Sequence, residues 1–534
     1  MIFPISWLPW IGSGGWLVQI PAYTVGVLIG AISLNVLWQF LPRPKTEPPL
    51  VFHWIPFIGN AVSYGADPFR FYVRCREKHG DIFTFILFGT KMTVYLGIQG
   101  NEFILNGKLQ DVNAEEIYSP LTTPVFGRDV VYDCPNAKLM EQKKFIKFGL
   151  THRALQSHVQ LIEKEVLDYI ASAPAFGHGQ ARTGTVDITT AMAQVTIFTA
   201  ARALQGAEVR AKLTTEFADL YHDLDGGFRP INFVMPWAPL PQNRRRDAAH
   251  AKMRAVYTGI IRQRRACGMR DQGEEPDMIW NLMRCTYKDG RPVPDTEMAH
   301  MMITLLMAGQ HSSASSSAWI MLRLAARPDI AEELYREQVV NLGGGSGAGA
   351  SSLLPPLQYE DVDKLPLLQN VVRETLRVNS SIHTLMRKVK NPMPVPGTDY
   401  IITPDKVLVA SPIVTHMSAE YFPDAETWDP HRWDARMAGD EEGDAAEDLV
   451  DYGYGATSKG TRSPYLPFGA GRHRCIGEKF AYVNLCTIVA TMVRNFRFST
   501  LDGKSWVPPT DYSSLFSRPS QPAVVRWERR FPVG

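Results

Sequence analysis

The sequence of 534 residues predicts a mainly helical fold with small β-sheets, preceded by one N-terminal transmembrane helix. Residues 295–327 form the longest uninterrupted helical pattern, with Pro294 before it and Pro328 after it. Residues 84–96 are rich in β-branched and aromatic side chains, which predicts a small hairpin. Residues 16–41 are predominantly apolar, and their length of about 20 to 25 residues is enough to cross a bilayer.

The first charged residues of the chain, Arg43 and Lys45, directly follow the apolar stretch. Basic residues that flank a membrane span tend to stay in the cytoplasm, so the N-terminus should be lumenal. A cleaved signal peptide would have a basic region before a shorter apolar core, and both are missing. A buried core helix is the alternative, which Trp16 and Trp38 disfavour because they stand where interfacial aromatic residues would. The predicted segments are a short lumenal N-terminus (1–15), a transmembrane anchor (16–41), a proline-rich linker (42–56) and a large catalytic domain (57–534).

Charge and cysteine content narrow the class of protein. The 56 basic and 54 acidic residues nearly cancel, so the composition gives no support for nucleic-acid binding. The six cysteines are widely scattered and show no metal-site spacing or disulfide framework, which indicates a reduced, cytosol-facing catalytic domain. Two polar segments, the Gly/Ser-rich residues 341–356 and the acidic residues 440–451, are predicted to be solvated surface excursions.

Cys475 closes a glycine-rich loop that begins at Phe468 and runs into a predicted helix over 478–496. A buried structural cysteine is the ordinary interpretation of an isolated cysteine. Here, however, the frame is F-x-x-G-x-(basic)-x-C-x-G, in which Gly471 permits a tight turn and Phe468 would cover the ligand's face. This loop resembles the haem-binding signature of the cytochrome P-450 superfamily, although His473 stands where most members have arginine. The resemblance implies the P-450 fold and haem b with an axial thiolate from Cys475.

The middle of the predicted long helix is unusually polar. Gly309, His311 and Ser312 are poor helix formers inside an apolar segment, which predicts a local distortion of the helix. A core histidine bonded to a backbone carbonyl is the alternative for His311. In the superfamily this part of the helix lies over the haem and carries an acid-alcohol pair that delivers protons, and His311 and Ser312 occupy those places. Serine in place of the usual threonine predicts some leakage of reducing equivalents to peroxide.

Glu374 and Arg377 share one helical face and would form an ordinary surface pair by themselves. Residues 430–433 follow downstream and resemble the superfamily's P-x-R-[WF] motif. The resemblance implies a buried network of Glu374, Arg377 and Arg432 that holds the scaffold near the haem and does not react.

Residues 131–145 and 226–233 resemble the corresponding segments of the sterol 14-alpha demethylase family (lanosterol demethylases), especially its fungal members. The resemblance implies haem-propionate contacts from Tyr118, Tyr132, Lys143, Arg387 and His473. A core tyrosine and a solvated lysine face are the alternatives. The predicted substrate contacts, for some of which core packing is the alternative, are Thr122, Phe126, Phe228, Phe233, Met307, His383, Thr384, Leu385, Met386, Leu515 and Phe516.

The activity that this resemblance implies is removal of the 14-alpha methyl group of lanosterol or eburicol in ergosterol biosynthesis. Three successive oxidations would each consume dioxygen and electrons from NADPH, delivered by a flavoprotein reductase, with cytochrome b5 as a further donor. The expected location is the endoplasmic reticulum membrane, in contact with lipid. Two alternatives remain: a haem-thiolate monooxygenase of another apolar substrate, such as a fatty acid or xenobiotic, and a non-catalytic membrane haem sensor.

Overall fold

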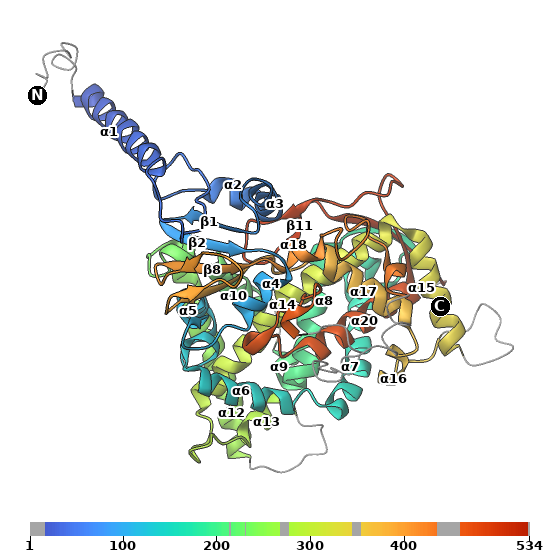
Figure 1. The fold of residues 1–534 in the computed structure, drawn as a ribbon. Helices are drawn as coiled ribbons and strands as arrows, with labels where there is room; N and C mark the ends of the chain where they lie inside the picture. The colour runs from blue at the N-terminus through green and yellow to red at the C-terminus, as the bar shows by residue number, and fades with distance from the viewer. Residues whose placement is uncertain are drawn as a thin grey trace, which may run out of the picture.

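The computed structural model describes residues 16–212, 215–229, 231–267, 277–343, 354–434 and 460–531. Helices form most of the body, and four small sheets lie among them (Figure 1). The predicted mainly helical class with small sheets is confirmed. The predicted lumenal segment 1–15 and acidic insert 440–451 lie outside the described residues, as does most of the predicted loop 341–356.

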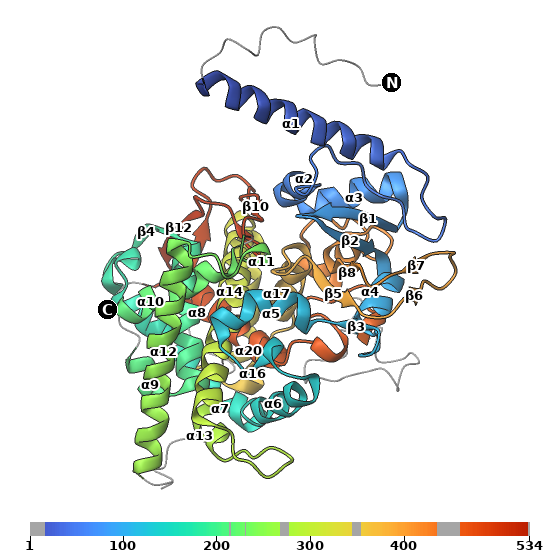
Figure 2. The same cartoon turned by 90° about the vertical axis from the view of Figure 1, so that its left-hand side faces the viewer.

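The predicted anchor region forms a helix, α1 (Trp16–Gln39), which stands clear of the body in both views (Figures 1 and 2). Its C-terminal end is attached to the body, since Asn35 and Gln39 donate hydrogen bonds to the backbone carbonyl of His53 at 3.0 and 2.7 Å. Within the part of the chain that the structure describes, no helix is both long and apolar enough to cross a membrane. The predicted transmembrane span is therefore not confirmed.

The largest sheet has five strands in the order β1-β2-β8-β5-β3. Only the β2–β8 pair is parallel. The predicted hairpin is confirmed as the β1–β2 pair, whose two-residue turn at Phe88 and Gly89 has positive φ at both positions. The strands are β1 (Ile82–Leu87), β2 (Thr90–Tyr95), β3 (Val112–Asn113), β5 (Leu385–Val389) and β8 (Lys406–Ala410).

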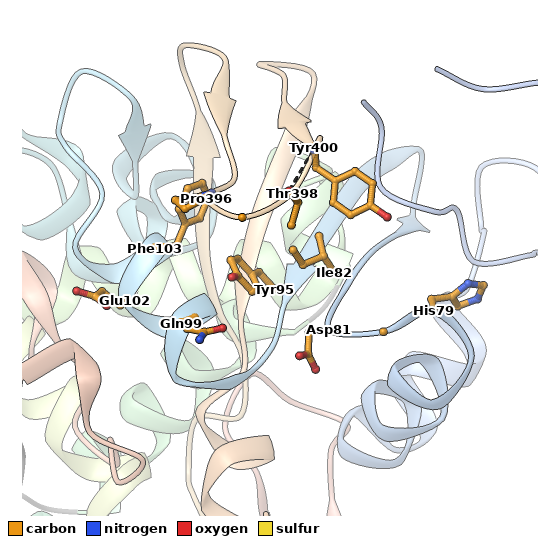
Figure 3. A pocket seen from close by; sticks show the side chains of 12 residues that line it. His79, Asp81, Ile82, Tyr95, Gln99, Glu102, Phe103, Pro396, Thr398 and Tyr400 are labelled. Atoms are coloured by element: carbon orange, nitrogen blue, oxygen red, sulfur yellow. Dashed lines mark hydrogen bonds between the residues drawn. The ribbon is translucent and has the colours of Figure 1, made fainter. Parts of the chain in front are cut away.

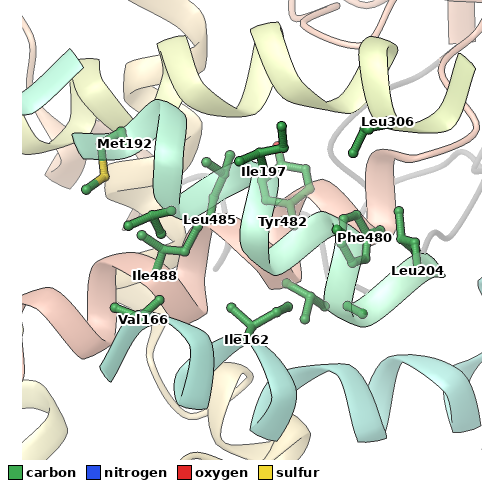
Figure 4. Packing of buried hydrophobic residues seen from close by; sticks show 14 of the residues in the cluster. Ile162, Val166, Met192, Ile197, Leu204, Leu306, Phe480, Tyr482, Leu485 and Ile488 are labelled. Atoms are coloured by element: carbon green, nitrogen blue, oxygen red, sulfur yellow. The ribbon is translucent and has the colours of Figure 1, made fainter. Parts of the chain in front are cut away.

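The core is organised around the long helix α14 (Asp295–Ala326), most of whose side chains are buried. Helices α8 (Ile188–Ala200), α12 (Pro241–Ala266), α17 (Pro366–Val378) and α20 (Glu478–Asn495) pack on it. Figure 4 shows how Leu306 of α14 and Phe480 of α20 face apolar side chains from α7 and α8 in the main hydrophobic cluster. The predicted helix over 478–496 is confirmed within one residue. Burial of apolar side chains from several helices thus fixes the position of α14.

The predicted distortion in the middle of α14 is not observed, because the helix runs unbroken from Asp295 to Ala326. The hydroxyl of Ser312 donates to the carbonyl of Ala308, one turn back, at 3.2 Å, so the serine is accommodated inside the helix. Tertiary burial on both sides of this segment outweighs the weak helix propensity of its residues.

The remaining helices connect these layers. They are α2 (Ala61–Ala66), α3 (Pro68–His79), α4 (Gly97–Leu105), α5 (Glu115–Phe126), α6 (Asn136–Phe148), α7 (His152–Ser172), α9 (Ala207–Ala211), α10 (Thr215–Asp225), α11 (Ile231–Val234), α13 (Met278–Met283), α15 (Pro328–Leu342), α16 (Tyr359–Val362) and α18 (Pro412–His416). Short helical turns are η1 (Val131–Asp133), η2 (Pro174–Gly179), η3 (Ala201–Gln205), η4 (Gly226–Phe228), η5 (Pro430–Trp433), η6 (Gly460–Arg462) and η7 (Gly471–His473).

Three further sheets lie outside the five-stranded one. They consist of β4 (Thr183–Asp187), β12 (Val524–Arg529) and β9 (Phe496–Ser499); β6 (Met393–Pro394) and β7 (Ile401–Ile402); and β10 (Thr510–Asp511) and β11 (Arg518–Pro519). The last pair forms the hairpin whose tip carries Leu515 and Phe516 into the site described next.

Candidate functional site

Cys475 lies at the end of a tightly closed loop directly before α20. Its backbone N–H donates to the carbonyl of Phe468 at 3.0 Å, which fixes the loop at both ends. Gly471 has φ +66°, and a Cβ there would lie 2.2 Å from the carbonyl oxygen of Leu105. Only glycine satisfies both conditions, so the loop geometry that presents Cys475 depends on this residue.

The Cys475 side chain keeps accessible surface. Burial of the thiol raises its pKa, while a hydrogen bond from the backbone at Gly477 lowers it in part. A metal ion bound there would replace the thiol proton, because the thiolate is the ligand.

Two buried cations lie near this thiol without a counterion. Arg387 is 4% exposed and Lys143 is largely buried, and neither has a carboxylate partner among the described residues. Burial lowers the pKa of Lys143, with Cys475 opposing that effect. A buried unpaired cation is costly, so this region fits a ligand that brings anionic groups. The propionates of a haem, together with an iron for Cys475, match this donor set.

Three rings are stacked beside these cations. Tyr118 and Tyr132 have ring centroids 5.0 Å apart, and the Tyr132 ring lies 5.7 Å from His473. Burial, then Arg387 and Lys143, hold the pKa of His473 at about 3, so it is neutral at physiological pH. The structure therefore brings together all five predicted propionate contacts.

Hydrogen bonds within the protein give two of these residues an additional role. The ammonium of Lys143 donates to the carbonyls of Arg472 and Arg474 at 2.7 and 3.2 Å, which ties α6 to the cysteine loop. The hydroxyl of Tyr118 accepts a hydrogen bond from the backbone N–H of Met386 at 3.0 Å. Their contacts with propionates stay predictions.

His311 on α14 has an acidic partner that the sequence did not reveal. Its Nε2 atom lies 2.9 Å from Asp225 Oδ1 and 3.4 Å from the hydroxyl of Tyr221. Burial is the largest single effect on Asp225 and opposes its ionisation. The hydrogen bond to His311 and the charges of His311, Arg518 and His222 together lower the pKa of the carboxyl. Asp225 ends α10 directly before the recognised Gly-Gly-Phe segment, and this acidic residue was the available signal.

Aromatic rings from four segments surround His311. Phe516 stacks on the imidazole at 5.0 Å between centroids, and Phe228 meets it edge-on at 5.9 Å. Phe228 also contacts Phe126 at 5.7 Å and Phe516 at 5.6 Å. These predicted substrate residues come from α5, η4 and the β10–β11 tip, so the cluster exists only in the folded chain.

Residues 381–386 run from α14 towards the cysteine loop. The hydroxyl of Ser381 donates to the carbonyl of Ser312 at 3.4 Å, and Leu385 borders Gly469, whose added Cβ would lie 3.7 Å from it. The hydroxyl of Thr384 lies 3.1 Å from those of both Tyr64 and Tyr72. Of the predicted residues in this segment, Leu385 borders the cysteine loop and Met386 meets Tyr118, while Thr384 contacts two tyrosines of the N-terminal part. The substrate contacts of His383 and Thr384 stay predictions.

Four other predicted substrate contacts have ordinary structural surroundings. The hydroxyl of Thr122 donates to the carbonyl of Tyr118 within α5 at 2.9 Å. Phe233 is partly buried against the main core, as is Leu515. Met307 has no exposed surface and lies within that core. Met307 lies one turn before His311 on α14, and its contact with substrate stays a prediction.

Glu374 is the centre of a charge network in which Glu374 and Arg377 are fully buried and Arg432 is 11% exposed. Arg377 donates to both of its carboxylate oxygens, at 2.7 and 2.9 Å, and Arg432 donates at 2.9 Å. The remaining guanidinium donors of Arg377 reach the carbonyls of His416 and Ala425 at 2.7 Å each. The three predicted residues thus meet, and they join α17 to the segment that leads into η5.

A separate hollow of about 950 Å³ lies between α4, the β1 end of α3 and the β6–β7 hairpin (Figure 3). Tyr95, Phe103 and Tyr400 line it together with two carboxylates. Both carboxylates are already paired, since Asp81 lies 2.6 Å from Arg76 and Glu102 lies 2.8 Å from Arg462. None of the predicted site residues borders this hollow, so it is not the site built around Cys475.

The chain belongs to the cytochrome P450 family, because the sequence model of that family, "Cytochrome P450", matches residues 48–527. The fold and the cysteine loop agree with this assignment, which implies haem iron with a thiolate ligand. The solved structure "Retinoic acid bound cyanobacterial CYP120A1" superposes with a TM-score of 0.71, covering 91% of this chain and all of that one. At 19% identity this likeness concerns the fold alone.

Curated relatives from fungi are far more similar. "Sterol 14-alpha demethylase" of Aspergillus flavus is 67% identical over 513 residues, which cover 96% of this chain and 97% of that protein. "Sterol 14-alpha demethylase CYP51A" of Gibberella zeae is 67% identical over 510 residues, with coverages of 96% and 98%. "Eburicol 14-alpha-demethylase" of Penicillium italicum is 61% identical over 524 residues, with coverages of 97% and 98%.

Proposed function

We propose that this protein is a sterol 14-alpha demethylase, a haem monooxygenase that removes the 14-alpha methyl group of eburicol or lanosterol in ergosterol biosynthesis. The observation that carries the proposal is Cys475, held at the end of a loop whose turn only Gly471 permits. High identity over nearly the whole length of the relatives named for this activity supports the choice of substrate.

When bound, a thiolate-ligated haem supplies the activation of dioxygen that oxidation of an unactivated methyl group requires. Cys475 would hold the iron, while Arg387, Lys143, Tyr118, Tyr132 and His473 would bind the propionates. The rings of Phe126, Phe228 and Phe516 would exclude water and orient an apolar substrate, since binding in one geometry selects the carbon that reacts.

Proton supply falls to His311 and its partners. The imidazole lies between Asp225 and the aromatic cluster, and Asp225 accepts the Nε2 hydrogen. A proton reaching Asp225 from solvent can pass to His311 and on towards the site, with Ser312 one residue further along α14. Overall, the sterol, three dioxygen, three NADPH and three protons would give the demethylated sterol with one new double bond, formic acid, four water and three NADP+.

A reconstituted assay tests the proposal. Purified protein, an NADPH-dependent flavoprotein reductase and eburicol or lanosterol should give the demethylated sterol and formate in equal amounts. The ferrous carbon monoxide complex should show the strongly red-shifted band of thiolate ligation, and Cys475→Ala should abolish it. A protein that has this band but oxidises a fatty acid and neither sterol would support the alternative monooxygenase. The same band with no oxygen-dependent NADPH consumption would support the sensor.

Membrane anchoring through α1, with the catalytic domain on the cytosolic face of the endoplasmic reticulum, completes the proposal. Its support is the uncharged stretch before Arg43 and the exposed apolar side chains of α1, such as Val27 at 71% and Leu34 at 69%. The protein should stay with membranes after carbonate extraction, and removal of residues 1–41 should release it. Recovery of the intact protein in the carbonate supernatant would refute the anchor without affecting the catalytic proposal.

A further inference from the structure

Two histidines that play no part in the proposed chemistry contact the backbone at the end of α5. His300 is buried and His250 is half-buried. His300 of α14 donates from Nδ1 to the carbonyl of Arg128 at 2.9 Å. His250 of α12 lies beside the backbone of Phe126, two residues earlier. The two rings lie 5.2 Å apart, and α5 contacts both α12 and α14 (Figure 2). Two neighbouring helices thus hold the same short piece of backbone.

Gly127 lies between Phe126 and Arg128, and its backbone packs closely against the His300 ring. Gly127 has φ +101°, and a Cβ built on it would lie 2.4 Å from two ring carbons of His300. The absence of a side chain therefore lets the imidazole lie directly against the backbone where α5 ends.

The gripped backbone forms part of the wall of the substrate site. Phe126, the last residue of α5, packs edge-on against Phe228, which in turn meets His311. Gly227 lies so close to α5 that a Cβ there would be 2.4 Å from a methyl carbon of Val125. No path for a bulky ligand opens between α5 and η4 while these contacts persist.

In the described part of the chain, each of the two histidines leaves one ring nitrogen without a hydrogen bond, which makes their contact with α5 reversible. The Nε2 atoms of both histidines are buried and have no hydrogen-bond partner among the described residues. Both rings are neutral, because burial lowers the pKa of His300 and, with His300 and Arg254, holds the pKa of His250 at about 4. Each Nε2 atom therefore has a buried lone pair without a hydrogen bond from any described residue. If the end of α5 moved away, water could donate to this lone pair, which favours the open state. The packing of the closed state opposes this effect.

We propose that His250 and His300 form a histidine clamp that holds the C-terminal end of α5 closed over the substrate site and sets the rate of substrate exchange. These are positioning residues, since they act through Phe126 and not on the reacting atoms. This proposal rests on the proposed function in one respect, because it assumes that the ligand that exchanges is a sterol.

The test measures sterol exchange in the full-length holoenzyme. Stopped-flow absorbance at the haem band follows dissociation of eburicol from wild type, His300→Leu, His300→Asn and His300→Gln. An asparagine amide reaches the position of Nδ1, whereas a glutamine amide reaches that of Nε2. We expect dissociation about fivefold faster in His300→Leu and His300→Gln, the value of one lost hydrogen bond, and a rate near wild type in His300→Asn. KM should rise with the dissociation rate, while kcat per haem stays within about twofold.

His158→Leu is the matched control. His158 on α7 is also buried with an unpartnered ring nitrogen, but its ring packs on Phe480 and away from α5. The His158→Leu substitution should lower the thermal stability of the protein and leave the rate of sterol dissociation unchanged. His250→Leu keeps the Arg128 contact and is the second variant if His300→Leu fails to incorporate haem.

Equal exchange rates in wild type, His300→Leu and His250→Leu would overturn the clamp, as would equal acceleration in His158→Leu. Absence of any eburicol or lanosterol binding to wild type would instead contradict the proposed function. The two failures are therefore distinguishable in the same experiment.

Discussion

Replacing Glu374 by alanine should cost more stability than any exposed ion pair in the chain. The Glu374 side chain has no exposed surface and accepts hydrogen bonds from Arg377, Arg432, the indole of Trp433 and the backbone of Asp429. The alanine variant leaves the fully buried guanidinium of Arg377 without its carboxylate. Breaking a buried pair in this way costs about 3 to 5 kcal/mol, a large part of the roughly 5 to 15 kcal/mol that stabilises a folded domain.

A chemically similar pair at the surface provides the control. Arg327 reaches both carboxylate oxygens of Asp329 at 2.9 and 2.6 Å, but the two side chains are 40% and 55% exposed. Solvent screening limits such a pair to about 0 to 1 kcal/mol, so Asp329→Ala should differ little from wild type.

Urea unfolding of the holoenzyme, followed by tryptophan fluorescence and by loss of the thiolate-haem band, measures the difference. We expect the midpoint of Glu374→Ala to fall far below that of Asp329→Ala, and the yield of haem-containing protein to fall with it. Glu374→Gln keeps the shape but loses the charge and should lie between the two. Equal midpoints for Glu374→Ala and Asp329→Ala would refute the assignment of this network as the main polar support of the fold.

Three further outcomes are expected. Gly471→Ala should prevent haem incorporation, because its Cβ would lie 2.2 Å from the Leu105 carbonyl oxygen at φ +66°, and a normal ferrous carbon monoxide spectrum would contradict this. Ser312→Thr should lower the peroxide formed per NADPH by restricting the hydroxyl rotamer, and unchanged ratios would remove that explanation. Burial raises the pKa of Glu337 from its ordinary value of 4.5 to about 7, so the folded state holds a proton that the unfolded state has lost. Stability should therefore fall as pH rises from about 4.5 to 7, and Glu337→Gln should flatten this dependence in thermal melts; an identical slope in both proteins would disprove it.

The class of site was readable from the sequence because its chemistry is local. The short loop from Phe468 to Cys475 contains the iron ligand Cys475, the glycine that makes the turn and the phenylalanine that would cover the ligand. Gly471 has the positive φ that such a turn needs. The hairpin over β1 and β2 and the helices α3, α14 and α20 were also predictable, since periodicity, prolines and glycines determine them within neighbouring residues.

Contacts between distant segments were decided by tertiary structure alone. Asp225 is 86 positions from His311, and no periodicity in the sequence indicates that the two side chains pair at 2.9 Å. The unbroken course of α14 through Gly309 and Ser312 likewise depends on packing from several helices, which outweighs local propensity. No sequence motif indicated a role for His250 and His300. They contact the end of α5 because two helices, α12 and α14, pack on the same stretch of backbone. The sequence by itself determined which chemistry the chain carries, because ligand and turn are local. Folding decided which groups serve that chemistry, because burial and charge pairing act between residues that only the folded chain brings together.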